Sequence, residues 1–293
     1  MSFIIATDTS ANLPSGYARK HDIPVIPFFY YMDGEEKSCP DTDSFDPAEY
    51  YGLLSQGVRV TTSQVTPQRF MDYVEPYLQR GEDVIFVSMS SGVSGSCNSA
   101  RIAAEELEEK YPERRIRIID TLGASLGEGL VAMRGIECRE KGMSFEETAD
   151  YLDELRHRVF NVFTVEDLMH LKRGGRLSPL SAVLGTVLNI KPLLKGNEEG
   201  KIVAYIKTRG RKKVIELLAE KYDSFVRNAR EQTVCISHAN CPDDAELLKS
   251  LILRNNPPRD VVIMPHEPVT GSYLGPGALA LYFESFEGVR LDS

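Results

Sequence analysis

DVIFVSMSSGVSGSCNSA, residues 83–100, is the most informative stretch of this chain for its fold class. Residues 83–89 are mostly apolar and rich in β-branched and aromatic side chains, which predicts a buried strand. A loop of serine and glycine follows, and a helix is expected from Ser94 to Lys110. A buried strand that leads into a helix is the repeating unit of a parallel sheet covered by helices.

The same alternation of strand and helix extends through the first half of the chain. Strands are expected over 3–7, 24–31 and 115–119, and helices from Asp46 to about Gln56, from Thr66 to near Gly81, and over 125–142 and 144–157. Asp33-Gly34 predicts a hairpin turn after the second of these strands. The series predicts an α/β fold with a mostly parallel sheet, helices on both faces, and ligands bound at the carboxyl ends of the strands.

The second half has more strands per helix. Strands are expected over 158–165, 233–237 and 260–264, and a hairpin over 189–207 around GNEEG. One helix is expected to end at Gly174-Gly175, and two more to cover 211–230 and 243–254. This pattern predicts a smaller α+β domain. We therefore expect an N-terminal α/β domain over 1–157 and a C-terminal α+β domain over 158–293.

Composition narrows the classes of function. The chain has 293 residues and a formal net charge of −9, which argues against nucleic-acid binding because that needs a basic face. No apolar run approaches the roughly 18 residues of a membrane span. Five cysteines without a C-x-x-C pair indicate reduced thiols, and hence a cytoplasmic protein. The five histidines lack metal-ligand spacing, so no metal site is predicted.

The serine- and glycine-rich loop over 88–98 is a candidate anion site. It precedes a helix, whose first N–H groups and dipole favour negative charge, and Gly95 lets the backbone approach a ligand. Ser94 offers a hydroxyl donor, although a serine here could equally serve only to cap the helix. A hydrolase elbow would need G-x-S-x-G, and the second glycine is missing after Ser94. A P-loop ending is missing too, which weakens both enzyme readings.

Other polar segments have both structural and functional interpretations. Thr62 and Ser63 belong to a run of donors over 61–64 that could be a polar turn before a helix capped by Thr66. Asp8 ends the first strand, where an Asx turn is favoured over a functional acid. Lys172, Arg173 and Arg176 surround two glycines, and could complement a helix C-terminus or face an anion.

One dense basic cluster stands out, KTRGRKKV over 207–214. Its cations are Arg209, Arg211, Lys212 and Lys213. They could be a solvated helix start, yet cations at a helix N-terminus oppose the dipole. That unfavourable placement favours a docking patch for an acidic partner.

An ordered set of segments resembles the DegV family of bacterial fatty-acid-binding proteins. These segments are TDTSANLP, TTSQVTP, SSGVSGS, IDT, DLMHLKRGGRLS, LNIKPLL, TRGRKK, SHANCPDDA and GPGALAL, in this order along most of the chain. The resemblance implies a two-domain fold that encloses one long-chain fatty acid in a buried interdomain tunnel. It also implies a carrier without catalytic residues or a cofactor, which presents the carboxylate to a partner ATP-dependent fatty acid kinase.

The resemblance also assigns residues. Thr62 and Ser94 match the hydroxyls that bind the carboxylate, with Ser63 and Gly95 beside them, and Arg173 matches an arginine near the head group. Tyr273 stands where the family often has a histidine; its hydroxyl can donate a hydrogen bond but cannot become cationic near neutral pH. The basic segment from Arg209 to Lys213 matches the region that meets the kinase.

Two other functions stay open at this point. One is an enzyme, a small-molecule phosphotransferase or esterase that uses Ser94. The other is a lipid sensor or carrier without a kinase partner. For the carrier, burying roughly 15 methylenes at ~0.8 kcal/mol each sets an upper bound near ~12 kcal/mol on the hydrophobic contribution.

Overall fold

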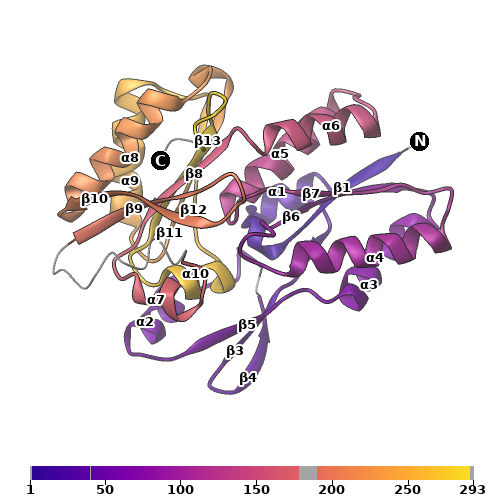
Figure 1. Cartoon of the computed structure of the whole chain (residues 1–293), viewed down its shortest axis with the longest axis horizontal. Coiled ribbons are helices and arrows are strands. Elements are labelled where there is room, and N and C mark those ends of the chain that lie inside the picture. The colour runs from indigo at the N-terminus through magenta and orange to yellow at the C-terminus, as the bar shows by residue number, and fades with distance from the viewer. Residues whose placement is uncertain (1, 40, 178–189, 291–293) are drawn as a thin grey trace.

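A parallel four-stranded sheet forms the centre of the N-terminal half of the computed structural model, which describes residues 2–39, 41–177 and 190–290. The strand order is β2-β1-β6-β7, and every neighbouring pair is parallel. Helices cover both of its faces, as predicted: α3 and α4 lie on one and α5 and α6 on the other (Figure 1). The elements are β1 (Phe3–Asp8), β2 (Val25–Ile26), β6 (Asp83–Ser88), β7 (Ile116–Asp120), α3 (Pro67–Gln79), α4 (Ser96–Lys110), α5 (Leu126–Glu140) and α6 (Phe145–Leu155).

The central strands carry the longest apolar runs. Every residue of β1 and β6 is buried, as expected for strands covered on both faces. Asp83 at the start of β6 is also fully buried, and its carboxylate accepts hydrogen bonds from the Arg115 backbone and guanidinium, at 3.1 and 2.8 Å. The predicted capping box of α6 is present, because Ser144 and Glu147 bond each other's backbone N–H groups.

A small antiparallel sheet extends from the parallel one (Figure 1). Its order is β4-β3-β5, and the hairpin predicted at Asp33-Gly34 joins β3 to β4. The elements of this part are η1 (Thr9–Ala11), α1 (Ser15–Lys20), β3 (Phe29–Met32), β4 (Glu35–Ser38), α2 (Pro47–Ser55) and β5 (Val60–Ser63).

The C-terminal half is built on a six-stranded mixed sheet of order β10-β9-β8-β13-β11-β12. All neighbours are antiparallel except β11 and β12, and the hairpin predicted around GNEEG joins β9 to β10. Its elements are β8 (Val159–Thr164), α7 (Met169–Arg173), β9 (Ile190–Gly196), β10 (Ile202–Arg209), α8 (Arg211–Phe225), η3 (Ala229–Glu231), β11 (Thr233–His238), α9 (Pro242–Asn255), β12 (Asp260–Pro265), α10 (Pro268–Leu274) and β13 (Leu279–Glu284). The end of the DLMHLKRGGRLS segment and the start of LNIKPLL lie outside the described residues.

The strand expected over 24–31 is divided into β2 and β3, which belong to different sheets. Several helix ends differ from the predictions by one or two residues, and two differences have consequences for the fold or the site. The helix expected to reach Arg230 ends at Phe225, because Val226 turns to an extended conformation and bridges to Ser285. The helix expected from Ser94 begins at Ser96, with Gly95 as its N-cap. Ser94 therefore belongs to the loop.

Helix α5 lies between the two large sheets and joins the halves of the molecule. It packs on β1 and β6 on one side and on β8, β11 and β13 on the other, and most of its residues are buried. A Cβ at Gly129 would lie 2.3 Å from the carbonyl oxygen of Ala11, so this helix can pack closely only with glycine there. The described strands before residue 158 belong to the first two sheets and those after it to the third. The division into domains at 157/158 stays a prediction.

Candidate ligand-binding site

A cavity of about 210 Å³ lies where the loop after β6 meets β5, α10 and the segment after α7. It is near the carboxyl end of β6, where ligands of open parallel sheets bind. Half of its described lining is apolar: Phe28, Met89, Val93, Ala124, Leu171, Ile202, Val269 and Leu274. The other half consists of Thr62, Ser63, Gln64, Ser94, Gly95, Arg176, Thr270 and Tyr273. The cavity is thus amphipathic, and both halves of the chain contribute to it.

Thr62 and Tyr273 meet at the polar end of the cavity. Thr62 is held by β5, which pairs with β3, and its hydroxyl lies 2.7 Å from that of Tyr273. Tyr273 is presented by α10, whose first turn is capped by the Glu267 carboxylate, which accepts from the Val269 and Thr270 N–H groups at 2.5 and 2.7 Å. Two hydroxyls from elements 211 residues apart in sequence therefore face one ligand site.

The Ser94 loop supplies the next donors. The Ser94 hydroxyl oxygen accepts from the Ser96 N–H at 3.2 Å, and its proton is directed to the Ser96 hydroxyl at 3.1 Å. The Gly95 N–H has no partner among the described residues and belongs to the N-cap of α4. A Cβ at Gly95 would lie 2.0 Å from Gln64 Oε1, so glycine allows the TSQ segment and the serine loop to pack together.

Arg176 lines the cavity, whereas Arg173, the arginine expected near the head group, does not belong to the described lining. Helix α7 ends at Arg173, which is exposed, and Gly175 takes a left-handed conformation that reverses the chain. Arg176 then donates to the carbonyl oxygens of Val93 at 3.0 Å and Gly174 at 2.6 Å. Its guanidinium carbon lies 4.6 Å from the centroid of the Tyr273 ring, a cation–π contact that fixes both side chains.

The charges of the cavity favour an anion. Arg176 is the one charged side chain of the described lining, and no carboxylate belongs to that lining. The N-terminus of α4 adds the positive end of a helix dipole and a free N–H group. Within the described ranges, no group of three or more His, Cys, Asp and Glu side chains could hold a metal ion. The arrangement suits a ligand with one negative charge and an apolar body.

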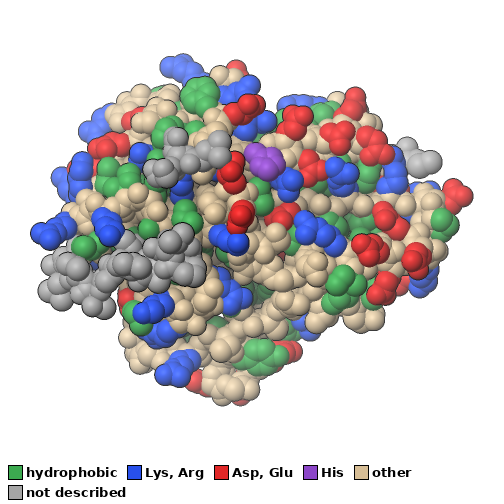
Figure 2. Space-filling model, in the orientation of Figure 1, with side chains coloured by type: hydrophobic (Ala, Val, Ile, Leu, Met, Phe, Trp, Pro, Cys, Tyr) green, Lys and Arg blue, Asp and Glu red, His purple; other side chains and the backbone are tan. Residues whose placement is uncertain are grey.

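The cations of the basic cluster differ in whether they form ion pairs. Arg211 is an internal ion-pair partner, 3.1 Å from Glu166 and 2.8 Å from Asp244, and Lys213 lies 3.3 Å from Glu220. Arg209 and Lys212 are exposed, and neither forms an ion pair within the described part of the chain. In Figure 2 several lysine and arginine side chains lie at the left, around α8 and β10. Lys213 is exposed as well but pairs with Glu216 and Glu220, so Arg209 and Lys212 are the exposed cations of the predicted docking set that have no ion pair among the described residues.

The family model for uncharacterised proteins of the DegV family matches residues 2–285. The chain belongs to the DegV family. A DegV domain-containing protein of Clostridium perfringens is 36% identical over 281 residues, covering 96% of this chain and 97% of the relative. A DegV domain-containing protein of Streptococcus pyogenes is 34% identical over 282 residues, covering 96% of this chain and 98% of the relative.

Solved DegV structures share the whole fold. A fatty-acid-binding DegV family protein from Thermus thermophilus superposes with a TM-score of 0.89 at 28% identity, covering 98% of this chain and 100% of that one. The fatty-acid-binding DegV family protein of Streptococcus agalactiae gives a TM-score of 0.85 at 29% identity, with 98% and 100% coverage. The expected DegV family and its two-domain α/β fold are confirmed. No helix of the described residues is long and apolar enough to cross a membrane.

Sequence reasoning missed some of the lining. Arg176 was noted as a cation near the double glycine, but the reversal at Gly175 that brings it to the cavity was not foreseen. Phe28 and Thr270 were not singled out, and their sequence neighbours carry no motif that could have revealed them. Neither His238 nor His266 belongs to the described lining.

Proposed function

We propose that this protein binds one long-chain fatty acid in the amphipathic cavity, with the carboxylate at the polar end. The observation that carries the proposal is the composition of the described lining: one arginine, several hydroxyls and no acid, together with eight apolar side chains. The DegV relatives of known structure from Thermus thermophilus and Streptococcus agalactiae are described as fatty-acid-binding proteins, which supports the same ligand class here.

In this proposal, Thr62, Ser94 and Tyr273 donate hydroxyl protons to the carboxylate, and Arg176 compensates its charge. Ser63 and the Gly95 N–H complete the polar end. Hydrogen bonds to a charged group contribute about 1.5–3 kcal/mol each, so the polar end orients the ligand. Burial of the methylenes contributes most of the affinity before the entropic costs of binding are subtracted.

We further propose that the chain is a carrier and performs no chemistry itself. Ser94 contacts another serine rather than a histidine or carboxylate that could activate it. No general base of the His, Asp, Glu or Lys type belongs to the described lining. An esterase or phosphotransferase that used Ser94 would lose activity on Ser94→Ala, and a measured hydrolytic rate that depends on this residue would replace the carrier proposal.

Presentation of the carboxylate to an ATP-dependent fatty acid kinase is the finer part of the proposal. The exposed cations Arg209 and Lys212 offer a surface for an acidic partner. Free cysteines, four of them buried, fit a reducing cytoplasm where such a partner would act. A sensor or carrier without a kinase partner is the alternative. Pull-down with a candidate kinase, compared between wild type and the Arg209→Glu, Lys212→Glu variant, separates the two.

The decisive experiment is mass spectrometry of solvent extracts from the purified protein. The expected result is a stoichiometric long-chain fatty acid in the wild type and a reduced amount in a Thr62→Val, Ser94→Ala variant. Repeated wild-type preparations without any acyl ligand, together with no binding of added palmitate, would overturn the proposal.

A further inference from the structure

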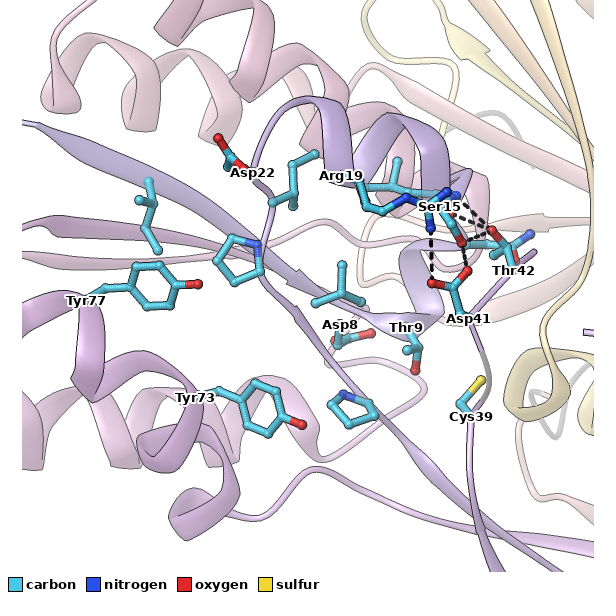
Figure 3. A pocket seen from close by; sticks show the side chains of 18 of the residues that line it. Asp8, Thr9, Ser15, Arg19, Asp22, Cys39, Asp41, Thr42, Tyr73 and Tyr77 are labelled. Atoms are coloured by element: carbon cyan, nitrogen blue, oxygen red, sulfur yellow. Dashed lines mark hydrogen bonds and ion pairs between the residues drawn. The ribbon is translucent and has the colours of Figure 1, made fainter. Parts of the chain in front are cut away.

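A second and larger cavity, of about 1020 Å³, lies beside β2 between α1 and α3. Figure 3 shows Tyr73 and Tyr77 of α3 on one side, Ser15 and Arg19 of α1 on the other, and Asp8 and Thr9 between them. None of the residues that line it also lines the fatty-acid cavity. The proposed function therefore leaves this cavity without a role.

The floor of the second cavity contains two buried oxygen atoms without a partner. Asp8 is 1% exposed and Asn12 2% exposed, and both line the cavity. The N–H and hydroxyl of Ser10 donate to Asp8 Oδ1, at 2.9 and 2.6 Å, while Oδ2 has no hydrogen bond among the described residues. The Asn12 side-chain N–H group donates to Pro265, and its Oδ1 is likewise unpartnered. Buried polar atoms of this kind are rare and require a partner.

The carboxyl groups of Asp8 and Glu128 share a contact with one hydroxyl. The Ser10 hydroxyl contacts both Asp8 Oδ1 and Glu128 Oε2. One hydroxyl proton cannot serve both contacts, so one of the two carboxyl groups must be protonated. Burial raises the pKa of both groups, that of Glu128 well above its usual value and that of Asp8 to about 7. Above pH 7, Glu128 is therefore the neutral acid that donates to Ser10, and Asp8 carries the negative charge, with its Oδ2 unpartnered among the described residues.

The charges around the cavity are unevenly matched. Five acids and three arginines line it. Arg19 pairs with Asp41 and Arg80 with Glu82 of the same lining, while Arg139 donates to the carbonyl of His21 and has no ion pair among the described residues. Glu267 is buried, has a raised pKa and caps α10. When Asp8 is ionised, Asp8 and Asp22 therefore outnumber the one unpaired cation of the described lining, and the cavity has a small excess of negative charge.

The walls of the cavity add apolar and aromatic surface. Tyr73 is 40% exposed, and Tyr77 lies one helical turn further along α3. The Arg80 guanidinium already lies over the Tyr77 ring, 4.3 Å from its centroid, so Tyr73 is the ring that a ligand can use. Leu13 and Ile23 also line the cavity. An aromatic ring in a cavity that also contains a carboxylate can bind an organic cation.

We propose that this cavity binds a small organic cation, a primary ammonium with an apolar or aromatic body, through Asp8 Oδ2 and Asn12 Oδ1. The ammonium supplies donors to both unpartnered acceptors and compensates the charge of Asp8. The body of the ligand packs on Tyr73. The site is independent of the fatty-acid cavity, so the two ligands can be tested separately.

The test is a titration of the full chain with phenethylammonium, hexylammonium and agmatine, followed by calorimetry and by amide NMR shifts. It is performed at pH 8, above the pKa of about 7 that burial gives Asp8. The neutral and anionic controls are 2-phenylethanol and phenylacetate. At least one ammonium probe is expected to bind and to shift the amides of Asp8, Thr9 and Asn12, while both controls leave them unchanged.

Variants test which residues bind the ammonium probe. Asp8→Asn is expected to weaken the best probe by about tenfold or more, because it removes a charge-assisted hydrogen bond. Glu128→Gln keeps a neutral donor to Ser10 and should leave the affinity unchanged. Tyr73→Ala, at an exposed position, should weaken phenethylammonium more than agmatine. Palmitate binding by each variant shows that it is folded.

The proposal is overturned if no ammonium probe binds the wild type, which would mean that the floor takes only water. It is also overturned if Asp8→Asn binds the probes as well as the wild type, or if 2-phenylethanol and phenylacetate shift the same amides.

Discussion

The hydroxyl of Tyr273 on α10 lies 2.7 Å from the hydroxyl of Thr62 on β5, at the polar end of the fatty-acid cavity. The two hydroxyls share one hydrogen bond in this structure, and a carboxylate that replaces it can accept one proton from each hydroxyl. Tyr273 thus contributes a hydroxyl donor to the cavity. The cation at this end is Arg176, whose guanidinium carbon lies 4.6 Å from the centre of the Tyr273 ring.

Tyr273→Phe is expected to weaken palmitate binding by about threefold to tenfold, because one hydrogen bond to the carboxylate is lost while the ring that supports Arg176 remains. Isothermal calorimetry on delipidated protein measures the change. Tyr50→Phe is the matched control, because its hydroxyl donates to the carbonyl of Pro268 away from the described lining. An equal loss in both variants would show that Tyr273 acts only through stability.

Arg176→Leu and Arg173→Leu form a second matched pair. Removing Arg176 is expected to weaken fatty-acid binding by about tenfold or more, because the one cation of the described lining is lost. Arg173 is exposed, so its replacement should leave the affinity unchanged. A larger effect from Arg173 than from Arg176 in the same calorimetric assay would contradict the assignment made from this structure.

Arg173 and Arg176 show the limit of what the sequence alone could predict about the site. Local patterns correctly predicted the buried β6, the hairpins at Asp33-Gly34 and over GNEEG, and the Asx turn at Asp8, because each depends on neighbours within a few residues. Which arginine reaches the cavity depends on the chain reversal at Gly175 and on the packing of Tyr273, almost a hundred residues away in sequence. No local pattern contains that information.

The sheet order of the C-terminal half was unpredictable for the same reason. Strand β13, the last of the chain, inserts between β8 and β11. The end of α8 also depends on this distant part of the chain, because Val226 leaves the helix to bridge to Ser285. The prediction that this helix reaches Arg230 rested on helix propensity alone, which contains no information about that bridge. By contrast Thr62 and Ser94 could be singled out from the sequence, since both stand in loops or strand ends beside a helix start.

Gly92→Ala is expected to lower the free energy of unfolding by about 1–3 kcal/mol. A Cβ at this position would lie 2.5 Å from the carbonyl oxygen of Glu199, in the turn between β9 and β10. That turn is held against the serine loop, because the Ser90 hydroxyl donates to the Gly200 carbonyl oxygen at 3.0 Å. The clash is with backbone atoms, which cannot rotate away. Urea unfolding followed by circular dichroism measures the change.

Gly52→Ala in α2 is the control for this prediction. No atom lies within 4 Å of a Cβ built on Gly52, so alanine should stabilise the helix by up to about 1 kcal/mol. If Gly92→Ala proved as stable as Gly52→Ala, the turn and the serine loop could not be packed as described.

The buried carboxyl of Asp8 predicts an unusual dependence of stability on pH. Burial raises its pKa from 3.8 to about 7, against the lowering effect of the Ser10 hydrogen bonds. The carboxyls that face it are Glu128 on α5 and Glu267 before α10, and both have raised pKa values because they are buried too. A carboxyl with a higher pKa in the folded state binds more protons when folded, so its contribution to stability is lost as pH rises.

Asp8→Asn removes this ionisation without changing the shape of the side chain. The stability of the variant relative to the wild type should therefore increase steadily, by a few kcal/mol in total, between about pH 5 and pH 7, and should level off above the folded-state pKa of about 7. Glu147→Gln is the control: hydrogen bonds from the Ser144 backbone and hydroxyl lower the pKa of Glu147, so its effect should be constant over this range. Urea unfolding at each pH gives both differences. A pH-independent difference for Asp8→Asn would mean that Asp8 is ionised at pH 5 already, and that its carboxylate has a partner beyond Ser10.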